Sequence, residues 1–282
     1  MAVHGLEQEC FAIVVIKTSG DRIQDRPLAE AGGKGLFTKE IEEALRAGAV
    51  DLAVHSAKDM ATRLPDGLAI GAVLEREDVR DAFISIKFSS LREMPAGAKV
   101  GTSSIRRQAQ VKRARPDLQV VNFRGNVDTR LAKLEAGVAD ATFLAAAGLN
   151  RLGASHRITC LMPTSEMLPA VAQGAIVVEA RSNDAQNLDL VAPLEHRPTA
   201  LAITAERAFL ARLDGSCRTP IAGLATVSGD QLELIGQVLR PDGSEVLEAR
   251  RSGPTTNAGD IGDSAAADLL ARAGPGFFAG QL

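Results

Sequence analysis

Two adjacent arginines, Arg106 and Arg107, stand where a helix is expected to begin. The segment VGTSSIRRQ at 100–108 ends a short apolar run at Gly101 and continues with hydroxyl residues that favour a helix N-cap. A helix start offers unpaired backbone N–H groups and the positive end of the helix dipole, and guanidinium groups suit carboxylates. The combination predicts a site for a small ligand that carries several carboxylates or phosphates.

Further arginines are expected at the ends of secondary-structure elements. Arg124 follows a predicted strand, Arg130 lies four residues after Asn126, and Arg151 follows the sequence GLN at 148–150. Ligands of open α/β sheets gather at the carboxyl ends of strands, which favours a binding role for Arg124. A solvated surface position remains the better interpretation for any single arginine, whereas for the set the two interpretations are about even.

The segment DLAVHSAKDM at 51–60 predicts a strand that runs into a loop bearing Ser56, Lys58 and Asp59. A carboxylate beside a lysine stays ionised and can exchange a proton near a cationic intermediate. The alternative for Asp59 is a loop cap, and His55 is expected to pack in the core. No GxSxG motif is present to expose a nucleophilic serine.

The three cysteines are Cys10, Cys160 and Cys217. Their odd number and wide spacing, without a CxxC or HExxH motif, predict neither a disulfide scaffold nor a metal site. Cys217 differs from the other two because it lies beside an arginine in the polar segment GSCR at 215–218, where a thiolate is favoured. The sequence GGKG at 32–35 lacks the spacing of a phosphate-binding loop and is interpreted as a flexible connection.

The composition narrows the class of protein. The chain has 282 residues, of which 45% are hydrophobic, enough for two or three domains with their own cores. Its net charge of −3, with no Trp or Tyr, argues against a nucleic-acid binder or a membrane-surface protein. No apolar run approaches the roughly 18 residues needed to cross a bilayer. We expect a cytoplasmic protein that acts on a small molecule, with no nucleic-acid or membrane partner, as a monomer.

The elements that must position these residues alternate over the first 180 residues. Apolar runs at 11–16, 51–55, 68–74, 119–123, 141–145 and 175–180 predict strands, and 37–47, 103–113 and 127–136 predict helices. This alternation is typical of βαβ units with a largely parallel sheet.

The pattern changes near 192–198, where we place a domain boundary. A helix is expected at 199–213, strands at 222–228, 231–239 and 245–251, and a last helix at 262–273. The turn sequences GD at 229–230 and PDG at 241–243 separate the strands, so this part is an antiparallel meander in a small α+β domain.

Eight ordered segments of the chain closely resemble the hydroxymethylbilane synthase family, also called porphobilinogen deaminases. They are KTSGDRIQD at 17–25, GGKGLFTKEIEEAL at 32–45, DLAVHSAKDM at 51–60, VGTSSIRRQAQ at 100–110, FRGNVDTRLAKL at 123–134, AAGLNRLG at 146–153, LPAVAQGAI at 168–176 and ERAFLARLDGSCRTPIA at 206–222.

The resemblance implies an α/β fold of two doubly wound domains like those of periplasmic binding proteins, followed by the small α+β domain. It places residues 1–76 and 172–193 in the first domain, 80–168 in the second, and 197–282 in a C-terminal domain that carries the cofactor cysteine. The pattern of apolar runs does not by itself reveal this crossing between domains.

The resemblance also implies a reaction: four porphobilinogen molecules condense head to tail, each losing ammonia, and the product is hydrolysed to 1-hydroxymethylbilane. A dipyrromethane cofactor, made from the substrate, would be joined to Cys217 by a thioether. Asp59 and Lys58 match catalytic positions, Asp59 being the carboxylate that contacts pyrrole nitrogens. The positions that match cofactor-binding residues are Ser56, Thr102, Ser104, Arg106, Arg107 and Arg130, and those that match substrate-binding residues are Arg124 and Arg151.

One departure concerns the start of the chain. The family carries a strand and a TRxSPLA turn before the KTSGD-type segment, whereas here residues 1–9 lead almost directly into 11–16. We therefore expect a first sheet with one strand fewer and low or absent activity. A non-catalytic polycarboxylate-binding variant is the alternative, although retention of Asp59 and Cys217 favours the enzyme.

Overall fold

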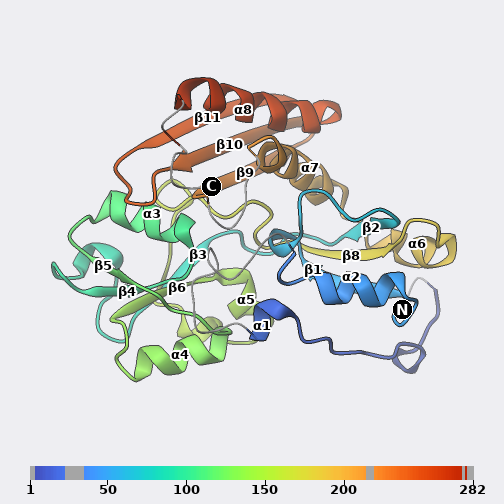
Figure 1. Cartoon of the computed structure of the whole chain (residues 1–282), viewed down its shortest axis with the longest axis horizontal. Coiled ribbons are helices and arrows are strands. Elements are labelled where there is room, and N and C mark those ends of the chain that lie inside the picture. Colours follow the sequence, from blue (N-terminus) through green and yellow to red (C-terminus); the bar gives the residue numbers. More distant parts are fainter. Residues whose placement is uncertain (1–3, 23–34, 214–218, 275–276, 278–282) are drawn as a thin grey trace.

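The computed structural model describes residues 4–22, 35–213, 219–274 and 277, and its described strands form three sheets (Figure 1). The first sheet has the order β1-β8-β2, from β1 (Leu52–Ser56), β8 (Ile176–Arg181) and β2 (Leu68–Val73). The chain enters β8 beside the last residue of β1, since Ser56 pairs with Ile176, so β8 runs antiparallel to β1 and also to β2. The prediction of a largely parallel sheet is wrong for these strands, because apolar runs report burial and not direction.

The second sheet is mixed and has the order β5-β4-β6-β3-β7. Its strands are β3 (Asp81–Ile84), β4 (Lys99–Gly101), β5 (Gln119–Val121), β6 (Ala141–Ala145) and β7 (Cys160–Leu161). The strand β4 is parallel to β5 and β6, whereas β3 is antiparallel to β6 and β7. Phe83 and Phe143 are fully buried with ring centroids 5.5 Å apart in an edge-to-face contact, so this sheet has a core of its own.

Two of the helices beside this sheet begin at polar caps, the first of them at a hydroxyl residue as the sequence predicts. The helix α3 (Ile105–Ala114) begins after Ser104, and α4 (Val127–Glu135) begins after Asn126, whose side chain accepts from the backbone N–H of Thr129 at 2.9 Å. A short helix, α5 (Ala146–Arg151), continues directly from β6. The sequence does not predict α5, because its residues are mostly apolar and show no helical spacing.

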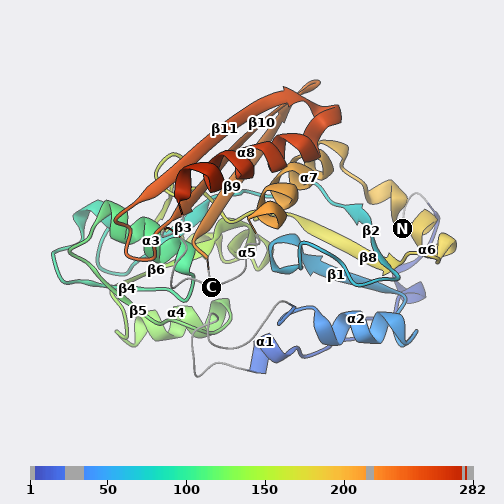
Figure 2. The same cartoon turned by 45° about the horizontal axis from the view of Figure 1, so that its top comes forward.

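The C-terminal unit is the expected antiparallel meander. Its strands β9 (Ile221–Ser228), β10 (Gln231–Leu239) and β11 (Val246–Pro254) pair in the order β11-β10-β9. Two helices, α7 (Arg197–Arg212) and α8 (Ala258–Ala273), pack on each other and on this sheet (Figure 2). Gly262 permits the close crossing, because a Cβ at this position would lie 2.1 Å from the carbonyl oxygen of Ala205.

The remaining described helices are α1 (Ser19–Arg22), α2 (Lys39–Arg46) and α6 (Ala185–Val191). The prediction of a strand at 11–16 is wrong: this segment forms no ladder with any described strand, and Ile13 and Val15 are 86% and 84% exposed. A β-branched run forms a strand only where a neighbouring strand pairs with it. In the described part of the chain, no helix is long and apolar enough to cross a membrane.

Two crossover segments join the first and second sheets. One leads from β2 to β3 through residues 74–80, and the other leads from β7 to β8 through residues 162–175 (Figure 1). They lie side by side, because the backbone N–H of Glu77 donates to the carbonyl of Gly174 at 3.2 Å. This double connection brings the carboxyl end of β1 close to the second sheet.

Candidate functional site

The carboxyl end of β1 presents Ser56, Lys58 and Asp59. A 3-10 turn, Ala57–Asp59, follows the strand, and the backbone N–H of Ala57 donates to the carbonyl of Ala175 at 3.0 Å. Ala57 is buried in the core, whereas Lys58 is half-buried and Asp59 is exposed. The turn therefore anchors its apolar residue inward and leaves the two charged residues at the surface of the site.

His55 has a structural position on the same strand. It is 5% exposed, and its Nε2 lies 3.1 Å from Oε2 of Glu179 on the neighbouring strand β8. The expectation of a packed core histidine is confirmed.

Lys58 lies within electrostatic reach of the second sheet. Burial lowers the pKa of Lys58; the charge of Asp59 opposes this shift and the charge of Arg107 adds to it, while Asp81 and Arg106 act as smaller influences of opposite sign. Residues from the turn after β1, from β3 and from α3 thus share one electrostatic environment.

The start of α3 is built from the hydroxyl residues that the sequence singled out. Ser104 is the N-cap, and its Oγ accepts from the backbone N–H of Arg107 at 3.4 Å. The Oγ1 of buried Thr102 accepts from the backbone N–H of Ser104 at 3.1 Å. These contacts place Arg106 and Arg107 in the first turn of the helix, as predicted.

The guanidinium groups of Arg106 and Arg107 bind an internal carboxylate that the sequence analysis missed. Asp81, the first residue of β3, is fully buried; its Oδ2 lies 2.8 Å from Nη2 of Arg106, and its Oδ1 lies 2.7 Å from Nη2 of Arg107. Each guanidinium also donates to a backbone carbonyl. Nη1 of Arg106 donates to that of Leu168 at 2.7 Å, and Nη1 of Arg107 donates to that of Phe143 at 2.8 Å. The one signal in the sequence was an acid at the head of the apolar run DAFI at 81–84.

Asp81 remains charged in this setting. Burial alone would raise the pKa of Asp81, but the charges of Arg106 and Arg107 and their hydrogen bonds outweigh it and hold the pKa well below its usual range. Gln173 also donates to Asp81, from Nε2 to Oδ1 at 3.1 Å. Two arginines on one carboxylate leave a net positive charge at the start of α3.

Arg124 and Arg130 extend this positive region to α4. Arg124 is buried and donates from Nη2 to the carbonyl of Gly20 at 3.3 Å, and Arg130 donates from Nε to the carbonyl of Gly125 at 2.8 Å. Burial, together with the nearby charges of Arg107 and Arg124, lowers the pKa of Arg130 to about 10. No carboxylate among the described residues forms an ion pair with Arg130, so cation–cation repulsion stays uncompensated there.

Two predicted residues fall outside this group. Arg151, at the end of α5, is exposed and donates from Nη2 to the carbonyl of Gly174 at 2.8 Å, so it lies at the crossover segments. Cys217 lies outside the described residues, as do the first three residues of the GGKG segment.

The arrangement suits an anionic ligand. Five cations influence one another's pKa here: Lys58, Arg106, Arg107, Arg124 and Arg130. Two carboxylates, Asp59 and Asp81, act on the same group. An excess of cations at a helix start favours a ligand with several carboxylates, which would relieve the repulsion. The described residues contain no group of three or more His, Cys, Asp or Glu side chains suited to a metal ion.

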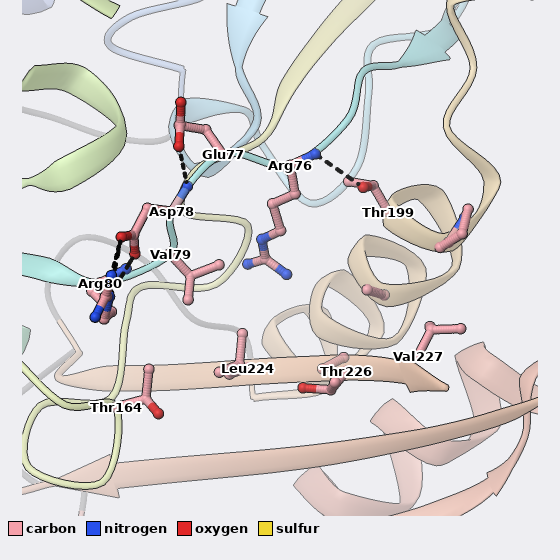
Figure 3. A pocket seen from close by; sticks show the side chains of 13 residues that line it. Arg76, Glu77, Asp78, Val79, Arg80, Thr164, Thr199, Leu224, Thr226 and Val227 are labelled. Carbon is pink, nitrogen blue, oxygen red and sulfur yellow. Dashed lines mark hydrogen bonds and ion pairs between the residues drawn. The ribbon is translucent and has the colours of Figure 1, made fainter. Parts of the chain in front are cut away.

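A cavity of about 460 Å³ lies elsewhere, where the first crossover meets α7 and β9 (Figure 3). Arg76 extends from the crossover beside α7 (Figure 3). Both of its terminal nitrogens bind the carboxylate of fully buried Glu206, at 2.6 and 3.0 Å. None of the predicted site residues lines this cavity. Arg80 pairs with Asp78 and Arg76 pairs with Glu206, so three of the charged residues that line this cavity have ion-pair partners within the protein. The candidate ligand site is therefore placed at the cations near α3 and not in this cavity.

The chain thus forms two sheets with α/β packing that are joined by a double crossover, followed by an α+β unit. This is the architecture of a multidomain protein, with a cation-rich site whose chemistry suits small anions. Residues 1–189 match the family model described as "Porphobilinogen deaminase, dipyromethane cofactor binding domain", and residues 200–271 match "Porphobilinogen deaminase, C-terminal domain". The chain belongs to the porphobilinogen deaminase family.

Curated relatives agree over nearly the whole chain. The porphobilinogen deaminase of Paracoccus denitrificans (strain Pd 1222) is 59% identical over 278 residues, which cover 99% of this chain and 89% of that protein. The porphobilinogen deaminase of Nitrobacter hamburgensis (strain DSM 10229 / NCIMB 13809 / X14) is 55% identical over 275 residues, covering 98% and 87%. Among solved structures, a periplasmic substrate-binding protein of an ABC transporter from Coxiella burnetii has a TM-score of 0.38 at 16% identity and covers 59% of this chain and 79% of its own.

Proposed function

We propose that this chain is a hydroxymethylbilane synthase, a transferase of tetrapyrrole and haem biosynthesis. It condenses four porphobilinogen molecules head to tail, releases one ammonia for each, and hydrolyses the product to 1-hydroxymethylbilane. Family membership at 59% identity supports the reaction, and the electrostatics of the site support the substrate class. The observation that carries the proposal is the cation cluster of Lys58, Arg106, Arg107, Arg124 and Arg130. Within it, burial and then the charges of Arg107 and Arg124 lower the pKa of Arg130.

The substrate carries an acetate and a propionate side chain, and the growing chain adds two carboxylates with each unit. Arg124 and Arg151 are proposed to bind substrate carboxylates, through guanidinium groups that form charged hydrogen bonds worth about 1.5–3 kcal/mol each. Arg106 and Arg107 already bind Asp81, so their main contribution is a fixed positive charge at the start of α3.

Asp59 is the proposed catalytic acid–base residue. When the C–N bond of the aminomethyl group breaks, ammonia leaves with the electron pair and positive charge spreads to the pyrrole nitrogen. An exposed carboxylate at a strand end can lie against that N–H, stabilise the developing charge and then take a proton. Lys58, whose pKa is lowered, is proposed to assist by holding a substrate carboxylate nearby.

The residues present fit a dipyrromethane cofactor. The hydroxyls of Ser56, Thr102 and Ser104 and the cations at 106, 107 and 130 are the donors that a group with four carboxylates requires. Within the described chain, the Nε of Arg106 is a buried donor without a partner, which an acceptor from a ligand could satisfy. The bound cofactor would supply the nucleophilic pyrrole carbon from which the chain grows, and Cys217 is proposed to hold it as a thioether.

The proposed domain division places residues 1–76 and 172–193 in one domain, 80–168 in the second and 197–282 in the third. The three sheets support it, because all strands of each sheet fall within one of these sets. We propose that the enzyme works as a monomer, since one chain supplies every candidate site residue. A cytoplasmic location is proposed because a thioether at Cys217 requires a reduced thiol.

The direct test is the intact mass of the purified protein from a host that makes porphobilinogen. We expect the parent to exceed its sequence mass by two linked pyrrole rings and to react with Ehrlich's reagent, and Cys217→Ser to lack both properties. Cys10→Ser is the matched control and should keep the added mass, since Cys10 is exposed at the far end of the chain. An unmodified parent, or a modified Cys217→Ser variant, would overturn the assignment.

A further inference from the structure

The turn between β10 and β11 is held by hydrogen bonds within the turn itself. The backbone N–H of Arg240 donates to the carbonyl of Glu245 at 2.9 Å, and the N–H of Gly243 donates to the carbonyl of Arg240 at 2.9 Å. The carboxylate of Asp242 accepts from both the backbone N–H and the hydroxyl of Ser244, at 3.0 and 2.7 Å. Gly243 has φ +74°, in the left-handed region that favours glycine.

This turn lies directly on the helix that carries Arg106 and Arg107. A Cβ at Gly243 would lie 2.4 Å from the backbone nitrogen of Arg113 and 2.7 Å from the carbonyl oxygen of Ala109, both in α3. These atoms belong to helix backbone, so no side-chain rotation can make room. The side chain of Gln108 adds a contact of 3.4 Å from Nε2 to the carbonyl of Pro241.

A second connection joins the same helix to the C-terminal sheet. The side chain of Gln110 pairs with the backbone of Leu168, accepting from its N–H at 2.7 Å and donating to its carbonyl at 3.0 Å. That carbonyl also accepts from Arg106, and the carbonyl of the next residue, Pro169, accepts from the N–H of Gly223 in β9 at 3.0 Å. The arginine-bearing helix is therefore attached to both β9 and the turn after β10.

The strand that leads into this turn also holds the segment next to the proposed cofactor cysteine. The backbone N–H of Leu239, the last residue of β10, donates to the carbonyl of Pro220 at 3.0 Å. Pro220 lies three residues after Cys217 in the sequence. Residues 239–243 thus contact Pro220 at one end and α3 at the other.

We propose that Gly243 is a positioning residue for the reaction. By letting the turn approach the backbone of α3, it fixes the start of that helix, with its two arginines, relative to the base of the segment that carries Cys217. This inference rests on the proposed function, because it assigns the contact a role in holding the cofactor near its cations. A side chain at position 243 would separate the turn from α3 and change this spacing, while each unit keeps its own core.

The chain offers a matched control in the other turn of the same meander. Gly229, between β9 and β10, also has a positive φ, +57°, but a Cβ there would meet nothing within 4 Å. Gly243→Ala and Gly229→Ala therefore introduce the same methyl group into the same kind of backbone conformation. They differ in the contact with α3.

The experiment compares the two variants with the parent by amide hydrogen exchange, intact mass and steady-state kinetics. We expect Gly243→Ala to exchange faster at 109–114, to retain less of the added pyrrole mass and to have a several-fold higher KM for porphobilinogen, while Gly229→Ala matches the parent in all three. Faster exchange with parental mass and kinetics would overturn the positioning role, and unchanged exchange would overturn the contact itself.

Two further outcomes keep the test decisive. If Gly243→Ala does not accumulate as folded protein, Gln108→Ala should increase exchange at the same residues by a smaller amount, and failure of that variant to do so would contradict the proposal. If the parent itself carries no pyrrole mass, the proposed function fails, whereas the exchange difference between the two glycine variants would still establish the contact.

Discussion

Asp81 is the buried counter-ion of Arg106 and Arg107 at the start of α3, so removing its charge should lower the stability of the fold. We predict that Asp81→Asn lowers the free energy of unfolding by about 3–5 kcal/mol, because it leaves two buried guanidinium groups without a counter-charge. Denaturant unfolding followed by circular dichroism measures the change. Glu135→Gln is the control, since the pair it forms with Arg157 is 55% and 30% exposed and contributes less than about 1 kcal/mol. Equal effects in both variants would contradict the prediction.

The same carboxylate should make stability depend on acid. The pKa of Asp81 is lowered in the folded protein, whereas in the unfolded chain it has an ordinary value of about 3.9. Its contribution is therefore fully present above about pH 4 and declines as the pH falls from there toward the folded pKa. Measured between pH 6 and pH 2.5, the stability of the parent should fall more steeply than that of Asp81→Asn. Parallel profiles would show that Asp81 does not drive the acid sensitivity.

Replacing Asp59 should lower the turnover rate and leave the fold intact. The change Asp59→Asn keeps the shape of the side chain and removes the charge, so we predict a loss of kcat on the order of 10²–10³, by analogy with the removal of one oxyanion-hole donor. Porphobilinogen consumption measures the rate, and an unchanged melting temperature shows that the fold is intact. Turnover near that of the parent would exclude the catalytic role.

At this scale the sequence predicted the residue types of the site better than their partners. The hydroxyl cap and the first-turn position of Arg106 and Arg107 follow from local pattern and are confirmed. Their contact with Asp81 could not be predicted, because it joins residues on different elements across the sheet. The sites of binding and catalysis remain predictions for the variants above.

Among the elements, the crossover segments depend on one buried carboxylate. Besides Arg76, Glu206 accepts the backbone N–H groups of Ala172 at 2.5 Å and Ala225 at 2.7 Å, so it joins both crossovers to β9. Ala172 has φ +61°, a conformation that these contacts help to hold.

We predict that Glu206→Gln lowers the free energy of unfolding by about 3–5 kcal/mol, because Arg76 loses its buried partner. Chemical denaturation measures it, with Glu245→Gln as control, since the Arg240–Glu245 pair is 35% and 47% exposed and should contribute less than about 1 kcal/mol. A loss in Glu206→Gln no larger than in the control would mean that the crossovers are held by other contacts.

The elements themselves were predicted to different degrees. Strands and helices with clear spacing or turn residues, such as β10 at Gln231–Leu239, agree with the sequence. The short strands β3, β4 and β7 were not assigned, because two to four residues show no periodicity. Segment 11–16 has the composition of a strand but pairs with no described strand. The prediction failed there because it rested on composition alone.

For the whole molecule, the change in sequence pattern near 192–198 predicted the boundary before the C-terminal meander. The pattern did not predict how the chain crosses between the first and second sheets. Apolar runs carry no information on which strands meet, so the placement of β8 between β1 and β2 came only with the resemblance and the structure. The same crossing explains why Gln173 meets Asp81, since this contact joins the second crossover to the first residue of β3.

The placement of β8 also sets an order of assembly. Its contact of Glu179 with His55 spans 124 residues, so the first sheet cannot close until nearly two thirds of the chain has left the ribosome, whereas every strand of the second sheet has emerged by then. Closing so long a loop is slow and is favoured once the intervening segment is compact. In pulse-labelled refolding, amides of β4 and β6 should therefore gain protection before those of β1 and β2. Until that step, the residues of β1, which lead to Asp59, are not held in a sheet. The proposed catalytic carboxylate is therefore put in place only after the second sheet has formed.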